Sequence, residues 1–266
     1  MIPQVDDLRA EGQELHHLLA SLGQKDWLRV TLFKAWTIDD IVRHLHMGDT
    51  MALTSASDPA AFATLMADIQ ARRKEGLTRT EETRRRLNGL GGPRLLKRWR
   101  EILDQLCDRL SDMAPDARLK WAGPDMGVRM FTTARQMETW SHAQAIFDLL
   151  GIERPPASPR LRNIAEIGVR TFGWAYRNRG LPVPSAMPSV HLETPFGETW
   201  DWAGSADDSV HGDAVSFCQV VTQTRNIADT TLAVRGETAR HWMSIVQCFA
   251  GPPETPPAPG TRHKIA

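Results

Sequence analysis

The sequence predicts a mainly α-helical protein in which an N-terminal four-helix bundle is followed by a smaller α+β domain. Apolar residues recur at helical spacing in four long segments of the first half of the chain. The Pro-rich stretch 153–159 then has the composition of a linker, and short helical and strand-like segments alternate beyond it. We therefore expect a bundle domain over residues 1–152, an α+β domain over 160–251 and a Pro-rich tail over 252–266 that is extended or disordered.

The bundle helices are marked by local start and stop signals. Thr37 can cap the second helix, and Asp40 can return the bond in a capping box. Pro93 occupies the first position of the third helix, where its missing N–H is tolerated. Gly151 is a natural stop for the fourth helix. The four helices are expected over about 5–22, 38–49, 92–110 and 133–150.

A long excursion, residues 58–88, separates the second and third helices. Asp58 before Pro59, and Thr78 with Glu81, are further helix starts, so we expect shorter helices here near one end of the bundle. An excursion of this length is a reasonable place for a lid or substrate loop. In the second domain we expect helices over 161–176, 214–222 and 241–249, a hairpin of 190–194 with 199–203, and a strand over 231–234.

Charge and cysteine content narrow the classes of function. The chain of 266 residues has 32 basic and 32 acidic side chains, so no overall positive field indicates nucleic acid or an anionic membrane as partner. Its three cysteines are scattered without a CxxC pair, which argues against a disulfide framework and a thiolate metal site. No segment has the pattern of a signal peptide or of a membrane span, so we expect a soluble cytoplasmic protein, monomeric or homodimeric.

Two ionisable residues lie on the apolar stripe of the fourth predicted helix. Glu138 and His142 are one turn apart and share a face with Ala134, Ala145 and Leu149. An unpaired charge in a core is costly, so these groups need a partner. A hydrogen bond between Glu138 and His142, or a salt bridge with an arginine, would supply that partner. A metal ion would serve as well, because Glu and His at this spacing can bind one cation together.

A third ligand has to come from another helix that faces the same core. On the second helix His44 and His46 flank the apolar face on opposite sides, and helical periodicity does not choose between them. Asp49 falls on the core side, one turn beyond Leu45. It could be a ligand, an acceptor that orients a ligating imidazole, or half of a salt bridge.

Three motifs together resemble a known family. Trp-Thr at 36–37, His-Leu at 44–45 and Glu-x-x-x-His at 138–142 are similar to the DinB-like, mycothiol-dependent maleylpyruvate isomerase-type metal-binding proteins. The Trp-Asp-Trp motif at 200–202 resembles the α+β domain that follows the bundle in the isomerase branch. Asp49 matches an acidic position that recurs near the metal site in this family, and the resemblance implies that it supports a ligand without binding the metal itself. The ligands that the resemblance implies are His44, Glu138 and His142.

The resemblance also implies a function. Two histidines and one carboxylate leave an open coordination position, as in catalytic zinc sites, and we expect Zn²⁺, with Fe²⁺ or Ni²⁺ as alternatives. A low-molecular-weight thiol such as mycothiol would be the co-substrate, and a small electrophile would undergo S-transfer or cis–trans isomerisation. A metal-dependent hydrolase, a non-haem iron oxygenase or a non-enzymatic module stabilised by metal stays open on the same residues.

An anionic substrate or thiol would need cationic partners. The excursion and the second domain both supply arginines, and the sequence does not single one out. The candidates are Arg72, Arg73, Arg84, Arg85 and Arg86 in the excursion, and Arg225 and Arg235 in the second domain.

Overall fold

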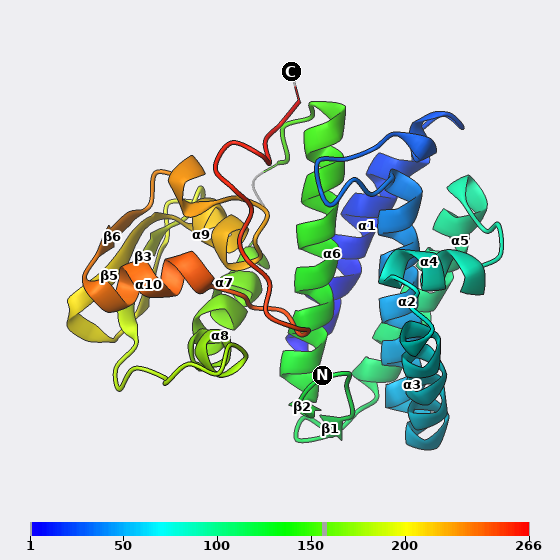
Figure 1. The fold of residues 1–266 in the computed structure, drawn as a ribbon, viewed down its shortest axis with the longest axis horizontal. Helices are drawn as coiled ribbons and strands as arrows, with labels where there is room; N and C mark the ends of the chain where they lie inside the picture. Colours follow the sequence, from blue (N-terminus) through cyan, green and yellow to red (C-terminus); the bar gives the residue numbers. More distant parts are fainter. Residues whose placement is uncertain (1, 156–158, 266) are drawn as a thin grey trace. The chain divides into compact units, whose positions relative to one another are not determined.

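The computed structural model describes residues 2–155 and 159–265 (Figure 1). The chain divides into two compact units, Met1–Ile146 and Phe147–Ala266. The division falls inside the last bundle helix, a few residues before the boundary expected at 152, and the predicted ranges 1–152 and 160–251 stay predictions. Part of the expected linker, 156–158, lies outside the described residues.

The first unit contains the expected bundle. Its four long helices are α1 (Pro3–Ala20), α2 (Ile38–Ser57), α5 (Gly92–Ser111) and α6 (Val128–Leu150). Helix α5 packs against both α1 and α2, and side-chain hydrogen bonds join α2 to α6. Helix α6 begins five residues before the predicted start at Thr133, because Val128 and Phe131 extend its buried face.

Three predicted helix caps in this unit are confirmed. Thr37 and Asp40 form a capping box at α2, and Thr78 and Glu81 form another at α4 (Arg79–Arg86). Asp58 caps α3 (Pro59–Lys74) by accepting two backbone N–H bonds. The excursion between the second and third bundle helices is therefore two shorter helices, as expected.

A tight turn lies in the segment between α1 and α2, after the 3₁₀ helix η1 (Asp26–Leu28). The Trp36 N–H donates to the Phe33 carbonyl, and Lys34 and Ala35 between them have φ of 51° and 54°. Positive φ at both central residues is the pattern of a type I′ turn, which normally prefers Asn and Gly. Neither Lys nor Ala adopts this conformation readily, so the turn stores backbone strain.

The second unit contains a four-stranded sheet in the order β4-β3-β5-β6. Strand β3 (Pro188–Glu193) pairs antiparallel with β4 (Thr199–Trp202) and parallel with β5 (Ser205–Asp213), which pairs antiparallel with β6 (Ala233–Arg235). Alternate residues of β3 are buried, so one sheet face packs against the core. The helices of this unit are α7 (Leu161–Arg170), α8 (Phe172–Arg177), α9 (Ala214–Val221), η2 (Ile227–Asp229) and α10 (Glu237–Ile245).

Several predicted elements of the second unit need correction. The helix expected over 161–176 is broken at Thr171, which ends α7 and precedes α8. Strand β5 was not predicted, because most of its residues are polar. The last helix begins at Glu237 instead of His241, since Gly236, with φ of 90°, ends the preceding strand. The hairpin of β3 and β4 is confirmed. A short hairpin in the first unit, β1 (Arg118–Leu119) with β2 (Met126–Gly127), was also missed.

For the Pro-rich tail the sequence left two states open, extended or disordered, and this expectation stays a prediction. The tail has no helix or strand over 252–265, but hydrogen bonds connect it to its own unit. The amide of Asn226 donates to the Pro257 carbonyl at 2.7 Å, and the Gly260 N–H donates to Asp229 at 2.8 Å. Prolines lack N–H groups, so the segment cannot form regular structure, yet its carbonyls are free to accept bonds from side chains.

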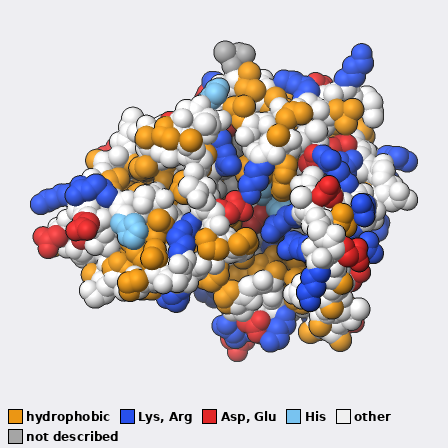
Figure 2. Space-filling model, viewed as in Figure 1, with side chains coloured by type: hydrophobic (Ala, Val, Ile, Leu, Met, Phe, Trp, Pro, Cys, Tyr) orange, Lys and Arg blue, Asp and Glu red, His pale blue; other side chains and the backbone are white. Residues whose placement is uncertain are grey.

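Two surface properties relate to the class of protein. In the part of the chain that the structure describes, no helix is both long enough and apolar enough to cross a bilayer. Basic and acidic side chains are both scattered over the face of the molecule shown in Figure 2.

Candidate metal centre

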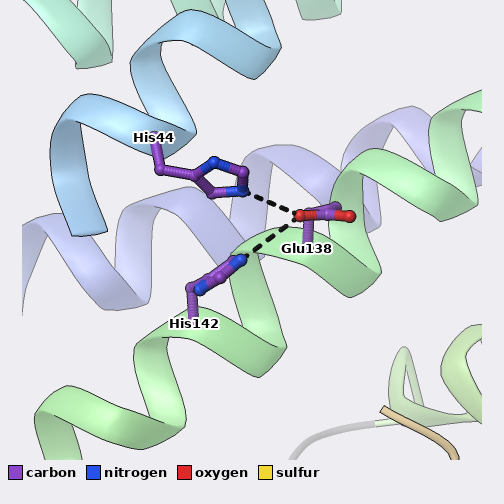
Figure 3. A group of neighbouring side chains, drawn as sticks. All are labelled: His44, Glu138 and His142. Atoms are coloured by element: carbon purple, nitrogen blue, oxygen red, sulfur yellow. Dashed lines mark hydrogen bonds and ion pairs between the residues drawn. The ribbon is translucent and has the colours of Figure 1, made fainter. Parts of the chain in front are cut away.

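Three side chains converge between α2 and α6 in the first unit, where His142 is buried and the other two are half-buried (Figure 3). Glu138 and His142 project from one face of α6, because four residues complete about one helical turn, and His44 projects toward them from α2. The Oε2 atom of Glu138 lies 3.1 Å from Nε2 of His44 and 3.4 Å from Nε2 of His142. Ligand atoms of all three residues lie within 4.8 Å of one another. The structure therefore brings together the three residues that the resemblance implied.

The charge states of His44 and Glu138 suit a metal ion. Burial and, to a smaller extent, the neighbouring His142 lower the pKa of His44 to about 3, so this imidazole is neutral at pH 7. Burial alone would raise the pKa of Glu138, but its bonds with His142 and His44 outweigh burial and hold the pKa well below its usual range. Neutral imidazoles and an ionised carboxylate are the forms that bind metal.

Two aromatic side chains line the cluster. The Trp36 indole stacks on the His142 imidazole, with an angle of 5° between the ring planes and 5.9 Å between the ring centroids. The centroid of the same indole lies 5.3 Å from that of the His44 ring. The Phe33 ring meets His142 edge-on at 5.0 Å. Both aromatic residues flank the strained turn, which thus places an apolar wall against the two histidines.

The structure separates the two histidines that periodicity left equal. His44 joins the cluster, whereas His46 is buried elsewhere on α2. Burial, together with the charge of Arg98, lowers the pKa of His46 to about 4. His46 is therefore a neutral core residue and not part of the candidate centre.

Of the alternatives that the sequence left open for Asp49, the structure shows the salt bridge. Asp49 is fully buried, and its carboxylate accepts hydrogen bonds from Nε1 of Trp99 at 2.8 Å and from Nε of Arg135 at 2.9 Å. Among the described residues these are its hydrogen-bond partners, and neither of them is a histidine of the cluster. The sequence did not identify Arg135 as its partner.

A small cavity lies beside His44. Asp40, in its wall, is neutralised by Arg84 at 2.6 Å and by Arg43 at 3.3 Å. In the described part of the chain no ion pair engages Arg79, and its charge adds to the lowering of the His44 pKa that burial causes. The lining residues are Trp36, Asp40, Arg43, His44, Arg79, Thr80 and Thr83.

The arginines suggested by the sequence are mostly engaged elsewhere. Arg72 and Arg86 both bond to Asp68, and Arg84 bonds to Asp40. In the second unit, Arg225 pairs with Asp148 at 2.7 Å and Arg235 lies on the edge strand β6. Ion pairs of this kind hold secondary structure together and leave little free charge for a ligand.

Sequence reasoning missed three residues of this site. Phe33 and Trp36 were not recognised as its aromatic wall, although their position directly before the helix with His44 was a usable signal. Arg79 was missed because an arginine after a helix cap has the pattern of an ordinary exposed residue. Only the folding of α4 back onto α2 places it beside His44.

A four-helix bundle with two histidines and one glutamate converging between α2 and α6 defines a helical protein with a candidate metal centre. The chain belongs to the family described as mycothiol maleylpyruvate isomerase N-terminal domain, whose model matches residues 8–147. The family resemblance inferred from the sequence motifs is thereby confirmed.

Individual relatives and solved structures agree with this assignment. Two uncharacterized proteins, from two strains of Mycobacterium tuberculosis, are each 38% identical over 252 residues, covering 94% of this chain and 96% of the relative. Crystal structures of the mycothiol-dependent maleylpyruvate isomerase and of a mutant of it match with TM-scores of 0.53 and 0.52. They are 14% identical and cover 82% of this chain and 87% of theirs, so they show the fold and confirm the predicted architecture.

Proposed function

We propose that this protein is an enzyme that uses a divalent metal ion and a low-molecular-weight thiol to act on a small electrophile. The convergence of His44, Glu138 and His142 carries the proposal. The family, and the isomerase named in the two matching crystal structures, support mycothiol as the thiol and cis–trans isomerisation as the reaction. S-transfer to the electrophile is the alternative outcome with the same reactants.

The cluster residues fit a metal ion. Ligand atoms at about 2.0–2.2 Å from a tetrahedral zinc ion are roughly 3.3–3.6 Å apart, close to the 3.1 and 3.4 Å found around Glu138. His44, Glu138 and His142 would hold Zn²⁺, the ion that we propose, with Fe²⁺ or Ni²⁺ as alternatives. When bound, such an ion supplies Lewis-acid chemistry and favours the deprotonated form of a thiol.

The nucleophilic sulfur has to come from outside the chain. All three cysteines are buried, and burial raises the pKa of Cys107, the one in the first unit, to about 12. A buried, protonated thiol is inert. In an isomerisation the external sulfur adds to one carbon of a conjugated double bond, and the resulting single bond rotates. The C–S bond then breaks, which restores the double bond and releases the thiol.

The cavity beside His44 would receive an anionic group of the substrate or of the thiol. Arg79 is its cation without a carboxylate partner among the described residues, whereas Asp40 has its charge balanced by two arginines. The field in the cavity is therefore positive next to the cluster. Trp36 supplies an apolar wall on which the carbon skeleton of a substrate can pack.

The test measures metal content and thiol dependence together. The protein is purified without added metal, its metal is identified by emission spectroscopy, and loss of maleylpyruvate is followed with and without mycothiol. We expect about one ion per chain and turnover only in the presence of the thiol. The His44→Ala variant should lose the bound ion and the turnover. The control is His17→Ala, a substitution of an exposed histidine of α1, which should keep the ion and the turnover.

Each other outcome would change the conclusion. A wild-type protein that acquires no ion, even when zinc is supplied, would overturn the proposal. Turnover of an ester or an oxidisable substrate without thiol would replace it with a hydrolase or an oxygenase. Bound metal that raises the melting temperature with no turnover of any electrophile would favour a structural module.

A further inference from the structure

A buried polar network joins three helices of the bundle close to the candidate metal centre. Asp49 on α2 and Arg135 on α6 are 0% and 3% exposed, and Trp99 on α5 is also fully buried. One carboxylate oxygen of Asp49 accepts from Arg135 and the other accepts from Trp99. The salt bridge thus crosses between the two helices that carry the cluster residues.

The salt bridge and the cluster are two contact points along one pair of helices. Asp49 follows His44 by five residues on α2, and Arg135 precedes Glu138 by three residues on α6. With a rise of about 1.5 Å per residue, the two contacts are roughly 5–8 Å apart along the axes. Two fixed contacts at this spacing determine how far α2 can slide along α6.

The approach of Arg135 to α2 depends on a glycine. A Cβ atom on Gly48 would lie 2.6 Å from Nη2 and 3.0 Å from Cζ of Arg135, closer than packing allows. Gly48 thus leaves the space in which the guanidinium rests against α2, and on another side Arg135 lies 5.9 Å from the Trp121 ring. The guanidinium is confined by packing as well as by its ion pair.

The network is not built for stability alone. Arg135 Nη2 is buried without a hydrogen-bond partner among the described residues. Burial raises the pKa of Asp49 in spite of the bonds from Arg135 and Trp99. Apolar residues in place of a buried ion pair are often neutral or stabilising, so such a pair is better explained by a demand for one particular arrangement.

We propose that Asp49 and Arg135 are positioning residues that set the register of α2 against α6 and thereby the spacing of His44 from Glu138 and His142. The inference rests on the proposed metal centre. A slide of one residue moves a ligand by about 1.5 Å, whereas metal–ligand distances tolerate about 0.2 Å. The pair acts on the metal through the backbones of the two helices and touches neither substrate nor ion.

The main test replaces the pair by apolar residues of similar size. We expect Asp49→Leu with Arg135→Met to keep the helical circular dichroism while the metal dissociation constant rises at least tenfold, measured by competition with a chromophoric chelator. The matched control is Arg9→Met with Asp104→Leu, which removes an ion pair between α1 and α5, helices without a cluster residue. The control should keep the wild-type dissociation constant.

A second variant alters the register without removing a charge. Gly48→Ala forces the guanidinium away from α2, and we expect metal binding at least threefold weaker. Alanine favours helix over glycine, so that loss would not come from a weaker helix. Wild-type dissociation constants in both the double variant and Gly48→Ala would overturn the positioning role.

A metal-free readout separates this inference from the proposed function. If the wild-type protein binds no ion, the proposed function fails, but the His44–Glu138 contact can still be followed by ¹⁵N NMR of the histidine rings. The double variant should shift the His44 signals, because this ring is held against Glu138. Unchanged His44 signals would refute the positioning role on their own.

Discussion

Replacement of Glu138 by Gln is the most direct test of the cluster. Its Oε2 atom contacts both histidines, so the substitution removes the charge of the proposed ligand while keeping the shape of the side chain. At a metal concentration of about 100 times the dissociation constant, binding stabilises the wild type by about 2.7 kcal/mol. At roughly 2–4 °C per kcal/mol, this raises the melting temperature by about 5–11 °C. We expect Glu138→Gln to weaken binding about a hundredfold, which leaves about 0.4 kcal/mol and a shift of roughly 1–2 °C.

The assay is differential scanning calorimetry of metal-free protein with and without added Zn²⁺. Glu101→Gln, an exposed glutamate of α5 in the same unit, is the matched control and should shift as the wild type does. If Glu138→Gln shows the full wild-type shift, the carboxylate is not a ligand and the reasoning from the cluster geometry is wrong.

Three further predictions follow from other parts of the first unit. Lys34→Asn with Ala35→Gly should stabilise the protein by about 1 kcal/mol in thermal melts, because Asn and Gly tolerate the positive φ of the type I′ turn; a lower melting temperature would contradict the strain. Burial alone would raise the pKa of Asp40, but the hydrogen bonds from Arg84 and Thr37 outweigh burial, so the pKa is lowered. The ionised Asp40 therefore stabilises the fold above about pH 4, and this stabilisation is lost as the pH falls through the lowered pKa. Asp40→Asn should therefore be destabilising in urea melts at pH 7, with a difference that shrinks in acid, and a constant difference would argue against this. Burial raises the pKa of Cys107 to about 12, so alkylation at pH 8 should require unfolding, and rapid labelling of the native protein at this residue would show that the thiol is accessible.

The bundle could be predicted from the sequence because its signals are local. Helix periodicity and the two capping boxes depend on residues within a few positions of each other. Strand β5 could not be predicted in the same way, since its partners β3 and β6 come from other parts of the chain and its own residues are largely polar. Pairing across a sheet is a tertiary property that one strand does not encode.

In the candidate site, too, features within one helix could be predicted from the sequence, and contacts between helices could not. Glu138 and His142 stand out because their spacing and apolar face are features of one helix. Periodicity left His44 and His46 equal because both border the buried face of α2, and only the position of α6 distinguishes them. The partnership of Asp49 with Arg135 depends on the same pairing of helices, so the sequence could mark Asp49 as anomalous without naming its role.

The two parts of the cluster are 94 residues apart in the chain. Helix α6 supplies two of the proposed ligands, and the third joins them only when α2 has docked, so an unfolded chain cannot form the complete cluster. Bringing such distant segments together is a slow, late event in folding. An ion that binds only the assembled bundle would therefore leave the folding rate nearly unchanged and would slow unfolding instead. For this protein, metal would act chiefly on the lifetime of the native state.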